Sequence, residues 1–250
     1  MTRKEPAGRH AVRVGVAGWS IPKEHAERFP AEGTHLERYA ATLPAVEINS
    51  SFYRPHQPKT YAQWAESVPE GFRFAVKAPR AATHERRLID ADDVLDRFLA
   101  EAGQLGEKLG PILVQLPPSL PFASDVADRF LGSLRDRFDG LIALEPRHAT
   151  WFGLEPERLL TRRRVARVAA DPAVAPTAGE PGGWDGLVYY RLHGTPKVYY
   201  SDYPAEYLAA VARKLEEAAR TAEAWCIFDN TAAFAAPGNA LDVLERLGAG

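Results

Sequence analysis

Three features are scarce in this sequence of 250 residues: cysteine, an excess of charge of either sign, and long apolar segments. Cys226 is the single cysteine, which excludes an internal disulfide and a zinc site built from several thiolates. The 31 basic and 33 acidic residues give a net charge of −2, so no overall positive field is present to hold a nucleic-acid backbone. No segment reaches the roughly 18 apolar residues of a membrane helix, and charges interrupt the N-terminus before a secretion signal forms. We therefore expect a cytoplasmic protein with no membrane partner.

Short apolar segments alternate along the chain with segments of helical period, which is the pattern of parallel strands joined by helices. Eight strands are expected, at residues 13–17, 45–49, 73–77, 112–115, 141–145, 166–171, 187–193 and 224–229. A length of about 250 residues is also typical of an eight-fold barrel. The sequence thus predicts an α/β fold, a single (β/α)8 barrel of the TIM type over residues 13–250, preceded by a flexible tail at residues 1–12.

The expected helices differ in how clearly the sequence marks them. Thr34 and Glu37 form a capping box that predicts a helix continuing to Thr42, and Ser124 is expected to cap another helix. Further helices are expected within residues 91–109, 207–222 and 239–247. The proline- and glycine-rich residues 172–183 predict a loop in place of a regular helix after the sixth strand. They could instead link two domains, but the elements beyond them would form a poor domain alone.

Polar side chains stand at the C-terminal ends of the predicted strands, whose interiors are apolar. In a parallel barrel these ends lie on one face, where barrel enzymes carry their active sites. Because side chains alternate along a strand, residues two apart share a face. Such pairs are Glu47 with Asn49, Glu145 with Arg147, and Arg191 with His193.

A candidate site follows from this ring and from the loops beside it. The residues assigned to catalysis, as proton-transfer groups or nucleophile, are Glu47, Lys77, Glu145 and His193. The residues assigned to substrate binding are Asn49, Tyr53, Arg54, His84, Gln115, Arg147, His148, Trp151, Arg191, Asp229 and Asn230. Cations outnumber acids in this set, which favours a small anionic partner, namely a phosphate, a carboxylate or a sugar phosphate. The alternative is a lattice of ion pairs that seals the barrel without further function.

Other chemistries receive less support from the residues. Lys77 is a candidate Schiff-base nucleophile, but an ion pair with Glu47 or Glu145 is expected to keep its amine charged. A divalent metal is possible on the carboxylates, yet no spaced metal motif is present, and we predict no cofactor and no metal ligand. Cys226 lies within an apolar strand and is expected to be a core residue.

The strand-end segments also resemble the sequence blocks of a known family. These blocks are VEINSSFYR at 46–54, FAVKAP at 74–79, GPILVQLPP at 110–118, EPRH at 145–148, YRLHG at 190–194 and FDNT at 228–231. In their order they are similar to the DUF72, or YecE-like, family. The resemblance implies a TIM-type barrel with its motif residues on the ring described above. It implies no activity, because the family is one of unknown function, sometimes described as related to sugar isomerases.

Three functions remain in competition. The first is an isomerase- or hydrolase-like enzyme that acts on an anionic, sugar-like or phosphorylated molecule, with Lys77, Arg147 and Arg191 holding the anion. The second is a non-catalytic module that binds an anionic metabolite with the same cations. The third is a barrel that processes nucleic acid, which the net charge of −2 disfavours. The sequence does not determine the oligomeric state.

Overall fold

The structure is a computed structural model, and it describes residues 10–248. Its strands form one 10-stranded sheet in the order β7-β9-β10-β1-β2-β3-β4-β5-β6-β8. Neighbouring strands run parallel, apart from the antiparallel pair β6 and β8. The strands are β1 (Val12–Ala17), β2 (Ala45–Ile48), β3 (Arg73–Lys77), β4 (Leu109–Gln115), β5 (Ile142–Glu145), β6 (Ala166–Arg167), β7 (Ala169–Asp171), β8 (Gly182–Gly183), β9 (Leu187–Leu192) and β10 (Glu223–Phe228).

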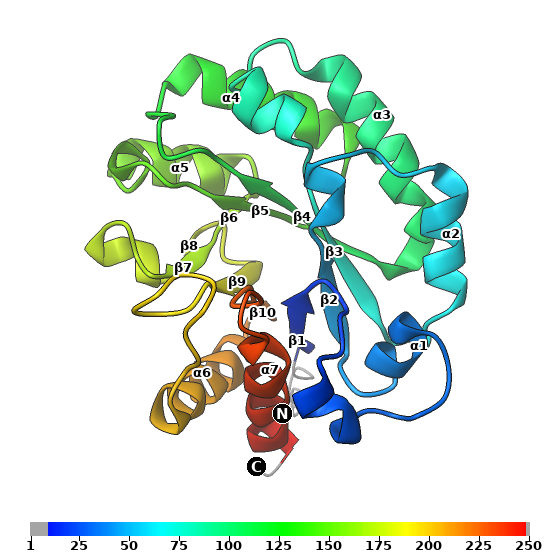
Figure 1. The fold of residues 1–250 in the computed structure, drawn as a ribbon. Helices are drawn as coiled ribbons and strands as arrows, with labels where there is room; N and C mark the ends of the chain where they lie inside the picture. Colours follow the sequence, from blue (N-terminus) through cyan, green and yellow to red (C-terminus); the bar gives the residue numbers. More distant parts are fainter. Residues whose placement is uncertain (1–9, 249–250) are drawn as a thin grey trace, which may run out of the picture.

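The sheet curves into a nearly closed barrel (Figure 1). Its two sides meet at the sixth predicted strand. Residues 166–171 form two strands instead of one, because the chain changes its partner at Val168. Before Val168, β6 pairs with β5; after it, β7 pairs with β9. The predicted α/β barrel of parallel strands is confirmed, with its irregularity at the expected strand.

Helices lie on the outside of the barrel and follow its strands around the ring (Figure 1). They are α1 (His35–Ala40), α2 (Pro58–Glu66), α3 (Asp92–Ala102), α4 (Ser124–Arg137), α5 (Leu154–Arg162), α6 (Ala205–Ala218) and α7 (Ala235–Gly248). Between β7 and β9 the chain forms a short 3₁₀ turn, Pro176–Gly179, and the strand β8. The prediction of a loop in place of a regular helix at this point is confirmed. None of the helices within residues 10–248 combines the length and the apolar character that crossing a bilayer requires.

The ends of the elements depart from the predictions in small ways. Ser124 is the first residue of α4 and not its cap; Ala123 holds the capping position without a side-chain hydrogen bond. Of the predicted tail, residues 1–9 lie outside the described residues. The remainder is attached to the barrel, since the N–H of His10 donates to the carbonyl of Ala219 (2.8 Å) and Val12 already belongs to β1.

The capping box of α1 is present as predicted. Thr34 Oγ1 accepts from the N–H of Glu37 (3.3 Å), and Glu37 Oε2 accepts from the N–H of Thr34 (2.7 Å). The helix carries Tyr39, whose hydroxyl accepts from the N–H of Val16 (2.9 Å) and donates to the carbonyl of Ala45 (2.9 Å). The cap therefore fixes a helix that joins β1 to β2. The helix ends at Ala40, two residues before the predicted Thr42.

Replacing Thr34 by alanine is expected to lower the free energy of unfolding by about 1 kcal/mol, because an N–H at the start of α1 loses its acceptor. Thr34→Ser keeps the hydroxyl and should melt close to the parent. Chemical denaturation of the three proteins measures the difference. Equal stability of Thr34→Ala and the parent would show that the capping box does not stabilise the fold.

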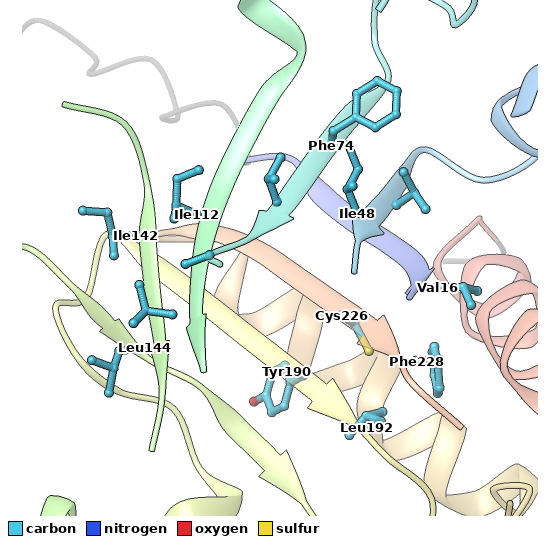
Figure 2. Close-up of a cluster of buried hydrophobic side chains, with 14 of the residues drawn as sticks. Val16, Ile48, Phe74, Ile112, Ile142, Leu144, Tyr190, Leu192, Cys226 and Phe228 are labelled. Atoms are coloured by element: carbon cyan, nitrogen blue, oxygen red, sulfur yellow. The ribbon is translucent and has the colours of Figure 1, made fainter. Parts of the chain in front are cut away.

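Side chains of each strand alternate between an outer and an inner apolar layer. Figure 2 shows part of the outer layer, which packs against the helices and includes Val16, Ile48, Phe74, Ile112, Ile142, Leu144, Tyr190, Leu192, Cys226 and Phe228. Cys226 is fully buried there, and burial raises the pKa of its thiol, as a core residue requires. The inner layer fills the barrel with Ala45, Ala75, Leu113, Ala143, Ala166, Val168, Leu187, Tyr189, Trp225 and Ile227.

Candidate functional site

The polar residues predicted at the strand ends continue the inner layer of the barrel. Each follows an inward apolar residue by two positions, so the same alternation that turns Ala45 inward also turns Glu47 inward. The equivalent pairs are Ala75 and Lys77, Leu113 and Gln115, Ala143 and Glu145, Tyr189 and Arg191, and Ile227 and Asp229. One end of the barrel core is therefore a layer of charged and amide side chains.

Arg191 lies at the centre of this layer and contacts three carboxylates. Its Nη2 is 2.7 Å from Glu47 Oε1 and 3.0 Å from Asp229 Oδ2, and its Nη1 is 3.2 Å from Glu145 Oε2. Its Nε also donates to Glu47 (3.0 Å), which makes that pair bidentate. Burial would lower the pKa of Arg191, but Asp229, Glu47 and Glu145 outweigh it and hold the pKa well above its usual value. This guanidinium is fully neutralised by the protein.

His193 and Arg147 complete the cluster around Glu145. His193 Nε2 lies 2.8 Å from Glu145 Oε1, and Nδ1 lies 3.0 Å from Asp229 Oδ2. Arg147 Nη2 is 2.6 Å from Glu145 Oε1 and 2.7 Å from His193 Nε2. Since a guanidinium only donates, Nε2 accepts from Arg147 in the neutral ring and donates to Glu145 in the charged ring. Both ring nitrogens of His193 thus face carboxylates.

The same contacts set the ionisation of the two carboxylates. Burial raises the pKa of Glu145, but Arg147, Arg191 and His193 outweigh burial and hold it well below its usual value. Burial likewise opposes ionisation of Asp229, whereas Arg191, His193 and Lys77 lower its pKa. Both groups are therefore anions at neutral pH, able to accept protons and unsuited to donate them.

Lys77 behaves differently from the two arginines. It is 5% exposed, and no carboxylate of residues 10–248 forms an ion pair with it. The predicted pair with Glu47 or Glu145 is wrong, because Arg191 already occupies both carboxylates.

The Lys77 amine lies 4.1 Å above the centre of the Phe52 ring. Burial and Arg191 lower the pKa of Lys77 to about 8, against the opposing effect of Glu47, Glu145 and Asp229. The nearby acids do favour the charged form of this amine, as expected, but burial and Arg191 outweigh them.

Phe52, which was not among the predicted site residues, lies in the turn after β2 and contacts both Lys77 and His84. Its ring centre is 4.9 Å from that of His84, whose pKa is lowered by burial, Lys77 and Arg80. Tyr53 is 71% exposed and does not reach the cluster. Phe52, Tyr53 and Arg54 instead line a neighbouring cavity of about 390 Å³.

The structure brings the other predicted residues together only in part. Gln115 Nε2 donates to Glu145 Oε2 (3.2 Å) and so joins the cluster. Asn49 is half-buried, and its Oδ1 accepts no hydrogen bond from the described residues.

Three predicted binding residues hold local structure. His148 Nδ1 accepts from the N–H of Thr150 (3.3 Å), which caps a 3₁₀ turn. Trp151 is 1% exposed, and its indole N–H donates to the carbonyl of Leu120 (3.0 Å), so it belongs to the core. Asn230 donates to the carbonyl of Ser201 (2.9 Å), which fixes the loop after β9. Their strand-end positions indicated the site, but their side chains turn away from it.

Tyr199, in that loop, is a second residue that sequence reasoning missed. Its ring stands edge-on to His193 with centres 5.8 Å apart, and the residue is 43% exposed. Burial and Asp229 raise the pKa of its hydroxyl. The N–H of Tyr199 donates to the carbonyl of His193, which folds the loop back over the strand end. The signal available in the sequence was the aromatic pair Tyr199 and Tyr200 beyond a strand end.

The described side chains do not form a metal-binding site. Within residues 10–248, no group of three or more histidine, cysteine, aspartate and glutamate side chains has the arrangement of a metal site. The physical reason lies in the cluster itself, where guanidinium groups occupy the carboxylate oxygens that a cation would need.

The sequence as a whole is similar to those of known proteins. Residues 13–250 match the family described as "Protein of unknown function DUF72". The chain belongs to the DUF72 family. It is 32% identical over 167 residues to the UPF0759 protein YecE of Escherichia coli K12, a match that covers 64% of this chain and 59% of YecE. It is 29% identical over 150 residues to the UPF0759 protein YunF of Bacillus subtilis, covering 56% of this chain and 52% of YunF. The chain thus spans between half and three fifths of these relatives.

Crystal structures of two DUF72 proteins share the architecture. The Enterococcus faecalis protein superposes with a TM-score of 0.80 at 23% identity, covering 95% of this chain and 96% of that one. The Thermotoga maritima protein superposes with a TM-score of 0.79 at 24% identity, covering 96% and 100%. At this level of identity the likeness establishes the DUF72 fold and nothing of its chemistry.

Proposed function

We propose that the protein is an enzyme that acts on a small anionic, sugar-like or phosphorylated molecule at the C-terminal end of its barrel. The supporting observation is that Lys77 remains without a carboxylate partner beside a buried cluster of three carboxylates. Such an unpaired, partly desolvated cation attracts an anion more strongly than a surface lysine does. The position at the strand ends is where barrel enzymes place their chemistry.

The contacts divide the cations into two groups. Arg191 is withdrawn from ligand binding, since three carboxylates neutralise it; it orients Glu47, Glu145 and Asp229 instead. Arg147 is better suited to the ligand, because its side chain is 15% exposed and, within residues 10–248, Glu145 is the one carboxylate that pairs with it. Glu145 and His193 would then move protons, and the exposed ring of Tyr199 would cover one face of a sugar.

Phosphate, glucose 6-phosphate and dihydroxyacetone phosphate are expected to raise the melting temperature and to bind in isothermal titration at low salt. Arg147→Gln should weaken this binding at least tenfold, because the partly exposed guanidinium charge is lost. Arg54→Gln is the matched control, since Arg54 is exposed on the neighbouring cavity and should keep the parent affinity. If none of the anions binds at millimolar concentration, or if both variants bind like the parent, the anion site does not exist.

Proton transfer separates an enzyme from a binding module. Incubated with the same sugar phosphates in ²H₂O, an enzyme with this cluster should exchange a carbon-bound hydrogen next to the carbonyl, visible as loss of a ¹H NMR signal. Binding without exchange or product formation would favour the non-catalytic alternative.

A further inference from the structure

The one cation of the cluster without a carboxylate partner is also the one amine in it. Arg191 contacts three carboxylates and Arg147 contacts Glu145, whereas Lys77 faces the ring of Phe52. An aromatic face attracts an ammonium but accepts no proton from it in an ordinary hydrogen bond. We propose that Lys77 is a nucleophile that forms a Schiff base with an aldehyde or ketone group of the substrate, a role that rests on the proposed binding of a small anionic molecule at this end of the barrel.

The position of Lys77 suits this role. It is the last residue of β3, and its side chain continues the inner layer after Ala75. Most of the side chain is packed, with 5% exposed, which fixes the direction of the amine. Within residues 10–248, Nζ has no hydrogen-bond partner. Protein atoms do not enclose it fully, so it keeps contact with solvent. The amine is therefore held in place and still touches solvent.

The charges around Lys77 make the free amine accessible at neutral pH. Burial and the nearby guanidinium of Arg191 lower its pKa to about 8, while Glu47, Glu145 and Asp229 raise it by less. The titratable group on the other side of the Phe52 ring is His84, which cannot supply a negative charge to stabilise the ammonium. At pH 7 about a tenth of such an amine is unprotonated, compared with well under a thousandth for an ordinary lysine. The unprotonated form is the one that attacks a carbonyl.

The reaction balances without any other reagent. The Lys77 nitrogen forms a bond to the carbonyl carbon, and the C=O electron pair moves to oxygen; the nitrogen then gives up one proton and the oxygen takes one up. The resulting carbinolamine loses its hydroxyl group with a proton as water, and the nitrogen lone pair forms the C=N bond of a protonated imine. Proton uptake and release fall to His193, whose two ring nitrogens face Glu145 and Asp229. An anionic group elsewhere on the substrate is held by Arg147, so a short carbonyl compound with a phosphate or carboxylate is the expected class.

Borohydride trapping tests the covalent step. The full-length protein is incubated with pyruvate, dihydroxyacetone phosphate or glyceraldehyde 3-phosphate and reduced with sodium borohydride, which converts an imine into a stable secondary amine. Peptide mass spectrometry should then find the adduct on Lys77 for at least one compound, at a rate that rises with pH up to about 8. Lys108 is the internal control, because it is partly buried and its amine donates to the carbonyls of Ala65 (2.5 Å) and Val68 (2.6 Å).

Lys77→Met should lose the adduct, and Lys59→Met, at an exposed lysine, should keep it. Lys77→Arg preserves the cation without a nucleophile and serves if Lys77→Met does not fold, as judged by its melting curve. Three results would overturn the inference: no adduct from any of the compounds, an adduct distributed over exposed lysines, or an adduct that survives Lys77→Arg. Phosphate binding measured on the same samples separates the two proposals, since bound phosphate without trapping rejects the Schiff base alone, and absent binding rejects the anion site.

Discussion

Replacing Arg191 by methionine is expected to lower the free energy of unfolding by about 3–5 kcal/mol, the usual cost of removing one partner from a buried ionic group. The change leaves Glu47, Glu145 and Asp229 close together without the guanidinium that they share. Methionine replaces most of the aliphatic stem of arginine, so the loss arises mainly at the guanidinium. Urea denaturation followed by circular dichroism at pH 7 measures the effect.

The matched control for this variant is Arg28→Met. Arg28 also contacts two carboxylates, Asp242 and Glu245, but it is 34% exposed and should cost less than about 1 kcal/mol. If Arg191→Met and Arg28→Met destabilise the protein equally, the buried cluster does not contribute to stability in the way its contacts indicate.

Acid is expected to destabilise the parent strongly, and Glu145 to account for much of the loss. Its pKa is held well below the usual value in the folded protein by Arg147, Arg191 and His193, despite burial. A carboxylate of this kind stabilises the fold above its unfolded-state pKa, and that contribution disappears as the pH falls through the folded-state pKa. Each unit of depression corresponds to about 1.4 kcal/mol. Asp229, lowered in the same direction, adds to the effect.

The variant Glu145→Gln isolates this contribution. It should be less stable than the parent by about 3–5 kcal/mol at pH 7, and the difference should narrow from pH 5 towards pH 2 as the parent carboxylate protonates. Asp139→Asn is the control, because the Asp139 side chain is 100% exposed and its removal should have the same small effect at every pH. A parent–Glu145→Gln difference that stays constant with pH would contradict the depressed pKa.

Much of this architecture could be predicted because local patterns in the sequence determine it. Alternation along the strands predicts which side chains enter the barrel, and this was sufficient to bring Glu47, Lys77, Glu145 and Arg191 to the same end of it. The proline- and glycine-rich residues 172–183 likewise predicted that no regular helix follows the sixth strand, since their backbones resist helical geometry.

Pairing within the layer could not be predicted, because it depends on distances across the barrel. Three carboxylates and three cations permit many pairings, and only the fold shows that Arg191 takes the central place and leaves Lys77 against Phe52. Rotamers set a second limit. Trp151 follows a strand end in sequence, but its indole N–H donates to the Leu120 carbonyl in the core.

The divided sixth strand determines where the native barrel opens most easily. β6 pairs with β5 over two residues and β7 with β9 over three, so amide hydrogens there should exchange with solvent before those of the longer ladders. Glu145, at the end of β5, is bound to Arg191 of β9 and to His193, the residue that follows β9. Electrostatic contacts thus replace part of the missing backbone pairing. Any ligand that competes for Glu145 also changes how often this edge of the barrel opens, so hydrogen-exchange rates of β6 and β7 report on events at the site.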